Sequence, residues 1–409
     1  MTARRRLVHI FFVFLMWTAD CGLSTYLAYA KLENGMDAAV VVGQKDFTSS
    51  GIGTSATTLD LSTFVTHIAT DGTRLFVPDT DNQRVLIYNK IPSHNGVAAD
   101  VVIGQTDFVT KTQGTSATKF RNPVAVATNG RQLAVADLTN NRVLIYNNIP
   151  ISNGTSADVV IGQSDFSGSG SGLASNRLNN PRGIGWIGEK FFITERNNNR
   201  VLIFNKTPTA NGASADVVIG QANFTSNLTT DIATGGRSAR VLVAPHDIAG
   251  ANGKLIIAEQ GSNRVLIFNS VPTTNYARAD IVIGQPDFTS ATGNNGGRSA
   301  RTLNDNNAVL YFGRELFVTD DVNNRVLVFK QLPSSNFSPA DFVLGQKDFT
   351  SSATGITSAR DFKGLMEGIA GNGRQLFIPD EIGNRILIFN LADQSAVKLG
   401  PQFDQGKAV

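Results

Sequence analysis

Residues 140–150 read NNRVLIYNNIP, and five related stretches lie elsewhere in the chain. Each stretch has an arginine followed by an apolar run. The arginines are Arg84, Arg142, Arg200, Arg264, Arg325 and Arg385, at spacings of 58, 58, 64, 61 and 60 residues. Such a constant period indicates that each repeat is one supersecondary unit, which buries its apolar face only by packing against its neighbours.

Three further runs accompany each arginine stretch. One run ends in an acidic residue five positions before the arginine, namely Asp79, Asp137, Glu195, Glu259, Asp320 or Asp380. Another contains the pair GQ and begins at Val40, Val101, Val159, Val217, Ile281 or Phe342. A weaker run, such as VAVATNG from Val124, precedes the acidic one. Gly, Asn, Asp and Pro separate the runs, which is typical of strands joined by turns.

We name the predicted strands of each unit a (the weaker run), b (the acidic run), c (the arginine run) and d (the GQ run). Four strands in each of six units, without a helical period, predict an all-β fold, a six-bladed β-propeller of four-stranded antiparallel blades. A length of 409 residues alone suggests about two or three domains. The period instead favours a single propeller over residues 31–409.

The acid that ends strand b and the Asn-Asn-Arg sequence that follows it resemble the NHL repeat. ADLTNNRVLIY from Ala136 and TDDVNNRVLVF from Thr319 carry the resemblance most clearly, and it covers about residues 38–400 in all six units. It implies a six-bladed propeller of an exported, bacterial type. The units are longer than is usual for NHL repeats, and the additional residues fall in the c–d and d–a connections.

The order of the motifs predicts how the ring closes. A d-type run at residues 38–43 precedes the first unit, whereas no GQ run follows the sixth. We expect residues 38–43 to form the outer strand of the last blade, because closure removes exposed sheet edges. The alternative is that the sequence AVKLG at residues 396–400 completes that blade.

Residues 1–30 are interpreted as a secretory signal peptide. Three arginines at residues 4–6 precede an apolar run at residues 7–17, which is too short to span a bilayer comfortably. The sequence AYA at residues 28–30 fits a signal-peptidase site. The protein is therefore expected to be secreted or periplasmic, with no membrane span after cleavage. The alternatives are a lipoprotein modified at Cys21 and an uncleaved anchor.

Cleavage after Ala30 would also change the charge and the redox chemistry of the chain. It removes three arginines and one aspartate, so the formal net charge of +3 becomes +1. A charge this small does not indicate a nucleic-acid partner. Cleavage also removes Cys21, the only cysteine, which excludes disulfides and thiolate chemistry from the mature chain.

The polar residues that repeat in every unit are interpreted as structural. Asp137 and Arg142 flank one b–c turn, and arginine suits multidentate hydrogen bonding to a carboxylate. The glycine of the GQ run suits a close backbone approach, and the following aspartate, such as Asp107, suits a turn cap. A feature present in all six units is more often a requirement of the fold than a ligand site.

Positions that break the repeat are the candidates for a ligand site. Alignment on the strand-b acid gives two neighbouring columns in strand a, Thr66, Val124, Arg182, His246, Asn307 and Glu367, and His67, Ala125, Gly183, Asp247, Ala308 and Gly368. Strand a lines the central channel of a propeller. We therefore expect the polar members Arg182, His246, Asn307, Glu367, His67 and Asp247 to form a ligand site at the channel mouth. The alternative is a water-filled channel that tolerates any polar residue.

The d–a connections offer a second candidate. They carry cations close to a Ser-Ala or Ala-Ser pair, and these are Lys119, Arg177, Arg240, Arg301 and Arg360. We expect these cations to form an outer basic ring around the mouth, which would attract an anionic partner. The alternative is that they bind loop carbonyls.

No P-loop, Gly-x-Ser-x-Gly elbow or His-x-x-x-His helix occurs in the sequence. The leading hypothesis is an exported, monomeric, non-enzymatic propeller whose mouth face binds a protein or an anionic glycan. The alternative is a calcium-dependent hydrolase or lyase similar to the gluconolactonase and paraoxonase propellers. Asp247, Asn307 and Glu367 resemble the Ca²⁺ ligands of those enzymes by residue type. No other cofactor is expected.

We expect the mature protein to begin at Lys31, because cleavage should follow the AYA sequence. N-terminal sequencing of the exported protein measures this directly. A chain that starts at Met1, or at a lipid-modified Cys21, would overturn the signal-peptide interpretation.

Overall fold

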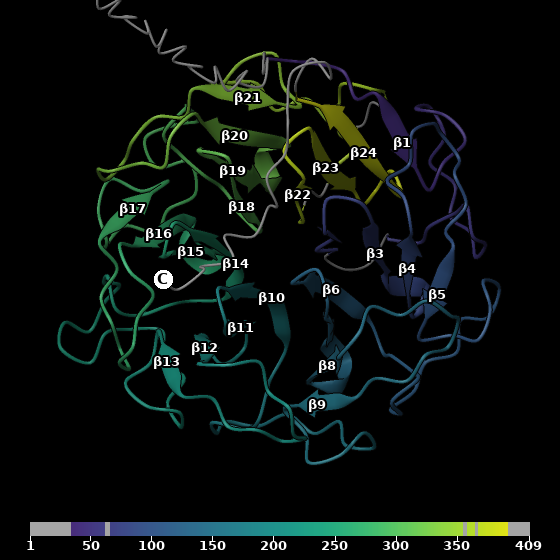
Figure 1. The fold of residues 1–409 in the computed structure, drawn as a ribbon. Helices are drawn as coiled ribbons and strands as arrows, with labels where there is room; N and C mark the ends of the chain where they lie inside the picture. The colour runs from purple at the N-terminus through teal and green to yellow at the C-terminus, as the bar shows by residue number, and fades with distance from the viewer. Residues whose placement is uncertain (1–33, 62–65, 355–357, 365–366, 392–409) are drawn as a thin grey trace, which may run out of the picture.

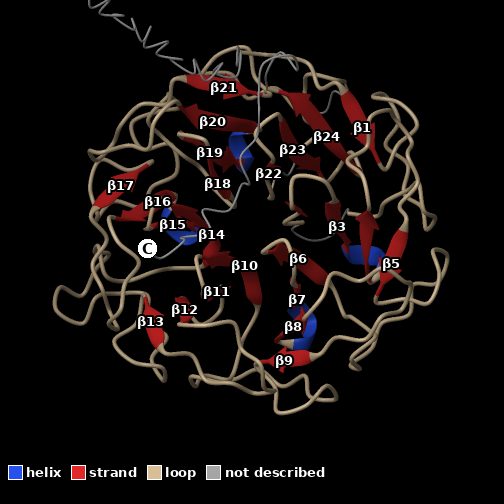
Figure 2. Ribbon diagram, viewed as in Figure 1, coloured by secondary structure: helices blue, strands red, loops and turns tan. Residues whose placement is uncertain are grey.

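The computed structural model describes residues 34–61, 66–354, 358–364 and 367–391, which form a closed ring of six sheets (Figure 1). Each sheet has four strands, and all neighbouring strands are antiparallel. Figure 2 shows that helix is confined to short turns. The predicted all-β, six-bladed propeller is confirmed. No helix in these described ranges is long and apolar enough to cross a membrane.

The strands follow the order a, b, c, d from the axis of the ring to its rim. Strand a is β2 (Ala69–Thr70), β6 (Pro123–Thr128), β10 (Pro181–Ile187), β14 (Pro245–Ala251), β18 (Val309–Phe312) or β22 (Ala370–Gly371). Strand b is β3 (Leu75–Asp79), β7 (Leu133–Asp137), β11 (Lys190–Glu195), β15 (Lys254–Glu259), β19 (Glu315–Asp320) or β23 (Gln375–Asp380). Strand c is β4 (Arg84–Tyr88), β8 (Arg142–Tyr146), β12 (Arg200–Phe204), β16 (Arg264–Phe268), β20 (Arg325–Phe329) or β24 (Arg385–Asn390). Strand d is β5 (Val101–Ile103), β9 (Val159–Ile161), β13 (Val217–Ile219), β17 (Ile281–Ile283), β21 (Phe342–Leu344) or β1 (Val40–Val42).

Four of the b–c turns contain a single turn of 3-10 helix. These are η1 (Thr80–Asn82), η2 (Leu138–Asn140), η3 (Gln260–Ser262) and η4 (Asp321–Asn323). Each ends at a residue with a left-handed backbone, such as Asn141 with a φ of 50°. Asparagine tolerates this conformation better than most residues, which explains its recurrence before the arginine.

The core consists of apolar side chains packed between adjacent blades. Ile145 of β8 and Phe191 of β11 belong to neighbouring blades and lie in one fully buried cluster. Strands b and c meet another blade on each face, which explains why their residues do not alternate with polar ones. Full burial of such a side chain contributes about 1.5–3 kcal/mol to the free energy of unfolding.

The last blade takes its outer strand from the N-terminal part of the chain, as predicted. β1 pairs with β24, with Val41 opposite Leu387. Just before this ladder, Ala39 N donates a hydrogen bond to Ile388 O at 2.7 Å. The alternative closing strand, residues 396–400, lies outside the described residues.

The residues before β1 also replace the c–d linker of the last blade. Within an ordinary linker, Asn153 Oδ1 accepts a hydrogen bond from Val102 N of the preceding blade at 3.0 Å. Asn34 Oδ1 accepts the equivalent bond from Val343 N, also at 3.0 Å. The closing segment therefore comprises a linker turn as well as a strand, which extends the sequence prediction.

The repeated arginine connects the b–c turn to two d–a loops. Arg142 Nε donates to Asp137 Oδ2 at 2.8 Å, and the two side chains are fully buried. Arg142 Nη1 donates to Phe166 O at 2.6 Å, in the loop that follows the blade. Arg142 Nη2 donates to Ser116 O and Lys119 O, in the loop that precedes it. The six arginines are fully buried, so the structural interpretation is confirmed.

The two asparagines before the arginine have separate structural roles. Asn140 Nδ2 donates to Asp137 Oδ2 at 2.8 Å and to Gly114 O at 2.9 Å, within one blade. Asn141 Oδ1 accepts a hydrogen bond from Asn180 N of the next blade at 3.0 Å. The Asn-Asn-Arg sequence therefore fixes its own turn, its own loops and the neighbouring blade.

The GQ run ends each outer strand with a constrained turn. Gly104 has a φ of 87°, and a Cβ there would lie 2.3 Å from a ring carbon of Phe120, so glycine is required. Gln105 Nε2 donates to Gln83 O at 2.9 Å. Asp107 Oδ1 accepts two backbone N–H groups of the turn that follows it. The predicted close approach and turn cap are both confirmed.

We expect Arg142→Ala to lower the free energy of unfolding by about 3–5 kcal/mol, because Asp137 would remain buried without its partner. Chemical denaturation measures the loss. Arg131→Ala is the matched control, because Arg131 is exposed in the β6–β7 turn on the opposite face of the ring. Equal stability of the two variants would contradict the structural role.

Candidate functional site

The residues predicted to form the channel mouth lie where strand a begins, close to the axis of the ring (Figure 1). Arg182 and His246 are the second residues of β10 and β14, whereas Asn307 and Glu367 come shortly before β18 and β22. Arg182, His246 and Asn307 are buried, and Glu367 is partly so. This end of the channel also carries the b–c turns, because strand b returns to it.

Side chains from opposite blades meet across the channel. His67 of the first blade lies with Nδ1 3.6 Å from Oδ2 of Asp247, in the fourth blade. The rings of His67 and His246 have centroids 5.9 Å apart. Asp247 Oδ2 also accepts a hydrogen bond from Val309 N of the fifth blade at 3.1 Å. The structure thus brings three predicted residues into one contact network.

The small residues of the second strand-a column allow neighbouring inner strands to approach closely. A Cβ on Gly183 would lie 2.7 Å from Asp247 Cα, and one on Gly368 would lie 2.0 Å from Thr66 O. His67 N donates to Val124 O at 2.8 Å in a parallel bridge between the first two blades. These glycines are therefore structural, and the polar members of the columns remain the site candidates.

A further set of mouth residues follows the strand-b acid directly, and the sequence analysis missed it. Glu381 Oε1 accepts a hydrogen bond from Thr66 N at 2.8 Å. Asp321 Oδ2 accepts one from Asn307 Nδ2 at 3.4 Å. The equivalent residues in the six blades are Thr80, Leu138, Arg196, Gln260, Asp321 and Glu381. Their signal was available, since this position varies beside an acid that is constant in type.

Charge is separated across the mouth. The third blade contributes Arg182 and Arg196, whereas the sixth contributes Glu367 and Glu381. The fifth blade adds Asp305 and Asp321 to the acidic side. Arg182 and Glu367 attract each other, yet no ion pair within 4.0 Å joins them in the described structure. The two walls therefore face each other with opposite charge and a separation between them.

Burial changes the ionisation of the mouth residues. It raises the pKa of Glu367 to about 8, with a further contribution from Asp321 and opposition from Arg182. Burial and then Glu367 raise the pKa of Glu381 well above its usual value. The pKa of His246 is lowered well below the usual value, first by burial and then by Arg182. The mouth thus favours neutral His246 and protonated glutamates near neutral pH.

Several buried polar atoms at the mouth have no hydrogen-bond partner. They are Thr66 Oγ1, His67 Nε2, Arg182 Nη1, His246 Nδ1, Asn307 Oδ1 and Glu367 Oε2. Buried polar groups are nearly always paired in folded proteins, and an unpaired one costs about 1–3 kcal/mol. Their concentration at one end of the channel distinguishes this end from the fully bonded turns around it.

The predicted outer cations contact loop groups rather than one another. Lys119 Nζ donates to Gln105 Oε1 at 3.1 Å, and Arg177 Nη2 donates to Gly170 O at 3.0 Å. The remaining three reach the c–d linkers or the closing segment, as Arg240 to Tyr276 O, Arg301 to Phe337 O and Arg360 to Asp37 Oδ1. None of these bonds reaches a mouth residue. Their role as an outer basic ring stays a prediction.

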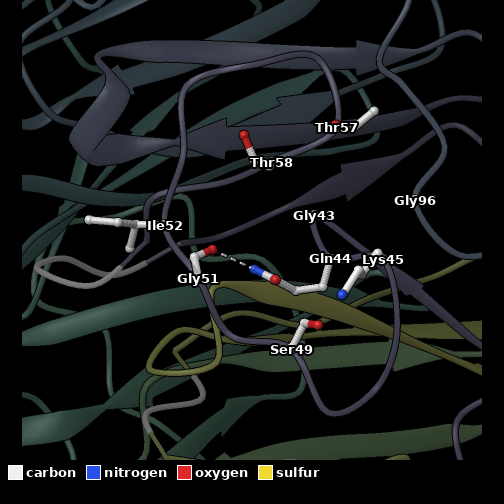
Figure 3. Close-up of a pocket in the computed structure, with 9 residues that line it drawn as sticks. All are labelled: Gly43, Gln44, Lys45, Ser49, Gly51, Ile52, Thr57, Thr58 and Gly96. Carbon is white, nitrogen blue, oxygen red and sulfur yellow. Dashed lines mark hydrogen bonds between the residues drawn. The ribbon is translucent and has the colours of Figure 1, made fainter.

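A separate pocket of about 420 Å³ lies at the rim, beside the closing strand β1 (Figure 3). Its lining residues are Gly43, Gln44, Lys45, Ser49, Gly51, Ile52, Thr57, Thr58 and Gly96. Gln44 Nε2 donates to Gly51 O at 2.8 Å, a bond that Figure 3 shows. The pocket therefore belongs to the GQ turn and lies apart from the channel mouth.

Among the described residues, no three His, Cys, Asp or Glu side chains gather closely enough to hold a metal ion. Two of the three residues considered for Ca²⁺ have other partners. Asn307 Nδ2 faces Asp321, and Asp247 Oδ2 accepts the Val309 amide.

Solved structures with a similar fold include three different proteins. Virginiamycin B lyase from Staphylococcus aureus has a TM-score of 0.42 and 11% identity, covering 79% of this chain and 94% of that chain. A nidogen/laminin complex has a TM-score of 0.39 and 14% identity, covering 68% and 83%. A putative 6-phosphogluconolactonase from Bacteroides uniformis has a TM-score of 0.45 and 12% identity, covering 88% and 94%. No protein-family model matches the sequence, and no curated protein matches it either.

We expect Glu367→Gln to weaken the dependence of stability on pH. The pKa of Glu367 is raised from 4.5 to about 8, so the folded state keeps a proton that the unfolded state releases. The stabilisation is complete below the unfolded pKa and is lost as the pH rises through the folded one. The fall in Tm from about pH 5 to pH 9 should be smaller in this variant than in the wild type.

The control for this measurement is Glu189→Gln, because Glu189 is exposed in the β10–β11 turn at the other end of the channel. It should keep the wild-type pH dependence. An unchanged fall in Tm for Glu367→Gln would show that the carboxyl ionises normally in the folded protein.

Proposed function

We propose that the protein is an exported, non-enzymatic NHL-type propeller that binds a protein or an anionic glycan on the face carrying the channel mouth. The observation that carries the proposal is the group of unpaired, buried polar atoms there, which includes Arg182 Nη1 and Glu367 Oε2. A ligand that satisfied them would remove a cost of about 1–3 kcal/mol for each group. No comparable cost exists at the repeated turns, where Arg142 uses all three nitrogens.

The outer cations support an anionic partner. Arg240 and Arg301 are exposed, and only one nitrogen of each donates a hydrogen bond to a linker carbonyl. A guanidinium has five N–H donors, so most of them remain available. The d–a loops lie on the mouth face, because their carbonyls bind the b–c turns through Asn140 and Arg142.

An immobilised polyanion, dextran sulfate, tests the glycan partner. The double variant Arg240→Gln/Arg301→Gln should elute at lower salt than the wild type, since exposed charges are screened within about 10 Å at 0.1 M. The control is Arg131→Gln, which removes an exposed arginine from the opposite face and should elute with the wild type. Equal elution of the double variant and the control would reject the glycan partner.

A protein partner is tested by using the exported chain as bait for the extracellular proteins of its host. A partner held at the mouth should bind the wild type and be lost with Arg182→Ala. If neither the polyanion nor any protein distinguished these variants, the binding function would be rejected. One equivalent of Ca²⁺ in the purified protein would contradict the non-enzymatic part and favour the hydrolase or lyase alternative.

A further inference from the structure

We propose that the channel mouth binds a nitrogen cation of its ligand, a primary ammonium or a guanidinium, against Glu367, Glu381 and Asn307. This inference rests on the proposed function, because it names the chemistry that the mouth recognises. The same chemistry belongs to a small free amine and to a Lys or Arg side chain of a protein partner.

The unpaired atoms on the acidic wall are acceptors. Glu367 Oε2 and Asn307 Oδ1 are buried and have no partner. Asn307 Nδ2 is occupied by Asp321 Oδ2, which directs the amide oxygen away from that carboxylate. Thr66 Oγ1 lies next to them in the chain closure, where Glu381 Oε1 holds the Thr66 amide. An ammonium has three N–H donors and a guanidinium has five, so either group can satisfy several acceptors together.

The distribution of charge favours a cation on the same wall. The carboxyl groups of Asp305, Asp321, Glu367 and Glu381 influence one another electrostatically, which places them in one cluster. The opposing guanidinium of Arg196 is engaged, because its Nε donates to Gln260 Oε1 at 3.2 Å. Hydrogen bonds between a charged nitrogen and a carboxylate are about twice as strong as neutral ones.

The basic wall selects a singly charged group. Arg182 and Arg196 face the acidic cluster and interact with Glu367. Repulsion between like charges grows in proportion to the charge of the ligand, so a divalent ion is opposed twice as strongly as an ammonium. A singly charged organic cation therefore suits the mouth better than Ca²⁺.

Thermal shift and calorimetry with simple probes test this inference. n-Butylamine and methylguanidine, both cationic at neutral pH, should raise the Tm of the wild-type protein. n-Butanol, butyrate and Ca²⁺ should not, because they lack the charge, reverse it or exceed it. An equal or larger shift with n-butanol, butyrate or Ca²⁺ would overturn the inference.

Two variants should change the affinity in opposite directions. Glu367→Gln keeps the shape of the side chain and removes its charge, so the Kd for n-butylamine should rise at least about tenfold, a change that corresponds to about 1.4 kcal/mol. Arg182→Gln removes an opposing charge, so the Kd should fall. Glu189→Gln, exposed at the other end of the channel, should leave the Kd unchanged.

The opposite response keeps the test decisive where a single variant merely unfolds. Should Glu367→Gln fail to fold, Glu381→Gln replaces it with the same expected loss of affinity. Loss of affinity in both Glu367→Gln and Arg182→Gln, with normal folding, would overturn the electrostatic argument.

A peptide with one lysine between alanines separates the two sources of the cation. Binding at least tenfold tighter than n-butylamine assigns the mouth to a protein side chain, and equal or weaker binding assigns it to a small amine. A protein that ignores every amine and guanidine yet keeps a partner dependent on Arg182 would refute this inference and leave the proposed function intact.

Discussion

The buried pair between the strand-b acid and the strand-c arginine is the interaction on which the rest of the structure depends. Arg142 contacts Asp137 and the carbonyls of two successive d–a loops, so a single side chain fixes three segments. Burial of both charges is costly, and it is tolerated because nearly every donor and acceptor finds a partner. Asp137 Oδ1 completes the arrangement by accepting the Arg121 amide at 2.7 Å.

This constant frame allows adjacent positions to vary without loss of the fold. The residue after the acid and the first residues of strand a lie on the axial side of the frame, as Glu381 and Thr66 do. Their backbones are held by the repeated hydrogen bonds, so their side chains are free to differ between blades. The mouth is therefore an asymmetric set of groups mounted on a nearly symmetric scaffold.

The sequence is sufficient to predict the fold because the constraints that create it repeat. The period, the arginine and the glycine with positive φ, such as Gly104, each report a local requirement that every blade shares. Closure by residues 38–43 follows from the order of the motifs, and β1 confirms it. The linker role of Asn34 was missed, because its Asn-Gly turn precedes the first recognisable run.

The candidate site is less predictable, because it does not repeat. The strand-a columns identify His67, His246 and Asp247, and the structure joins them. Glu381 escaped notice because its contact with Thr66 links residues 315 positions apart, across the point of closure. Contacts between blades on opposite sides of a ring depend on the diameter of the channel, which no local pattern encodes.

The closing segment has a consequence for the time at which the protein becomes a ring. Val41 pairs with Leu387, so the first strand to be synthesised waits for the last one before its edge is covered. Until then β1, a run of three valines, exposes unpaired backbone groups. Five blades can assemble progressively from the ribosome, whereas the sixth requires both ends of the chain at once. Synthesis of the final strand is thus the event that converts an open, adhesive arc into a closed molecule.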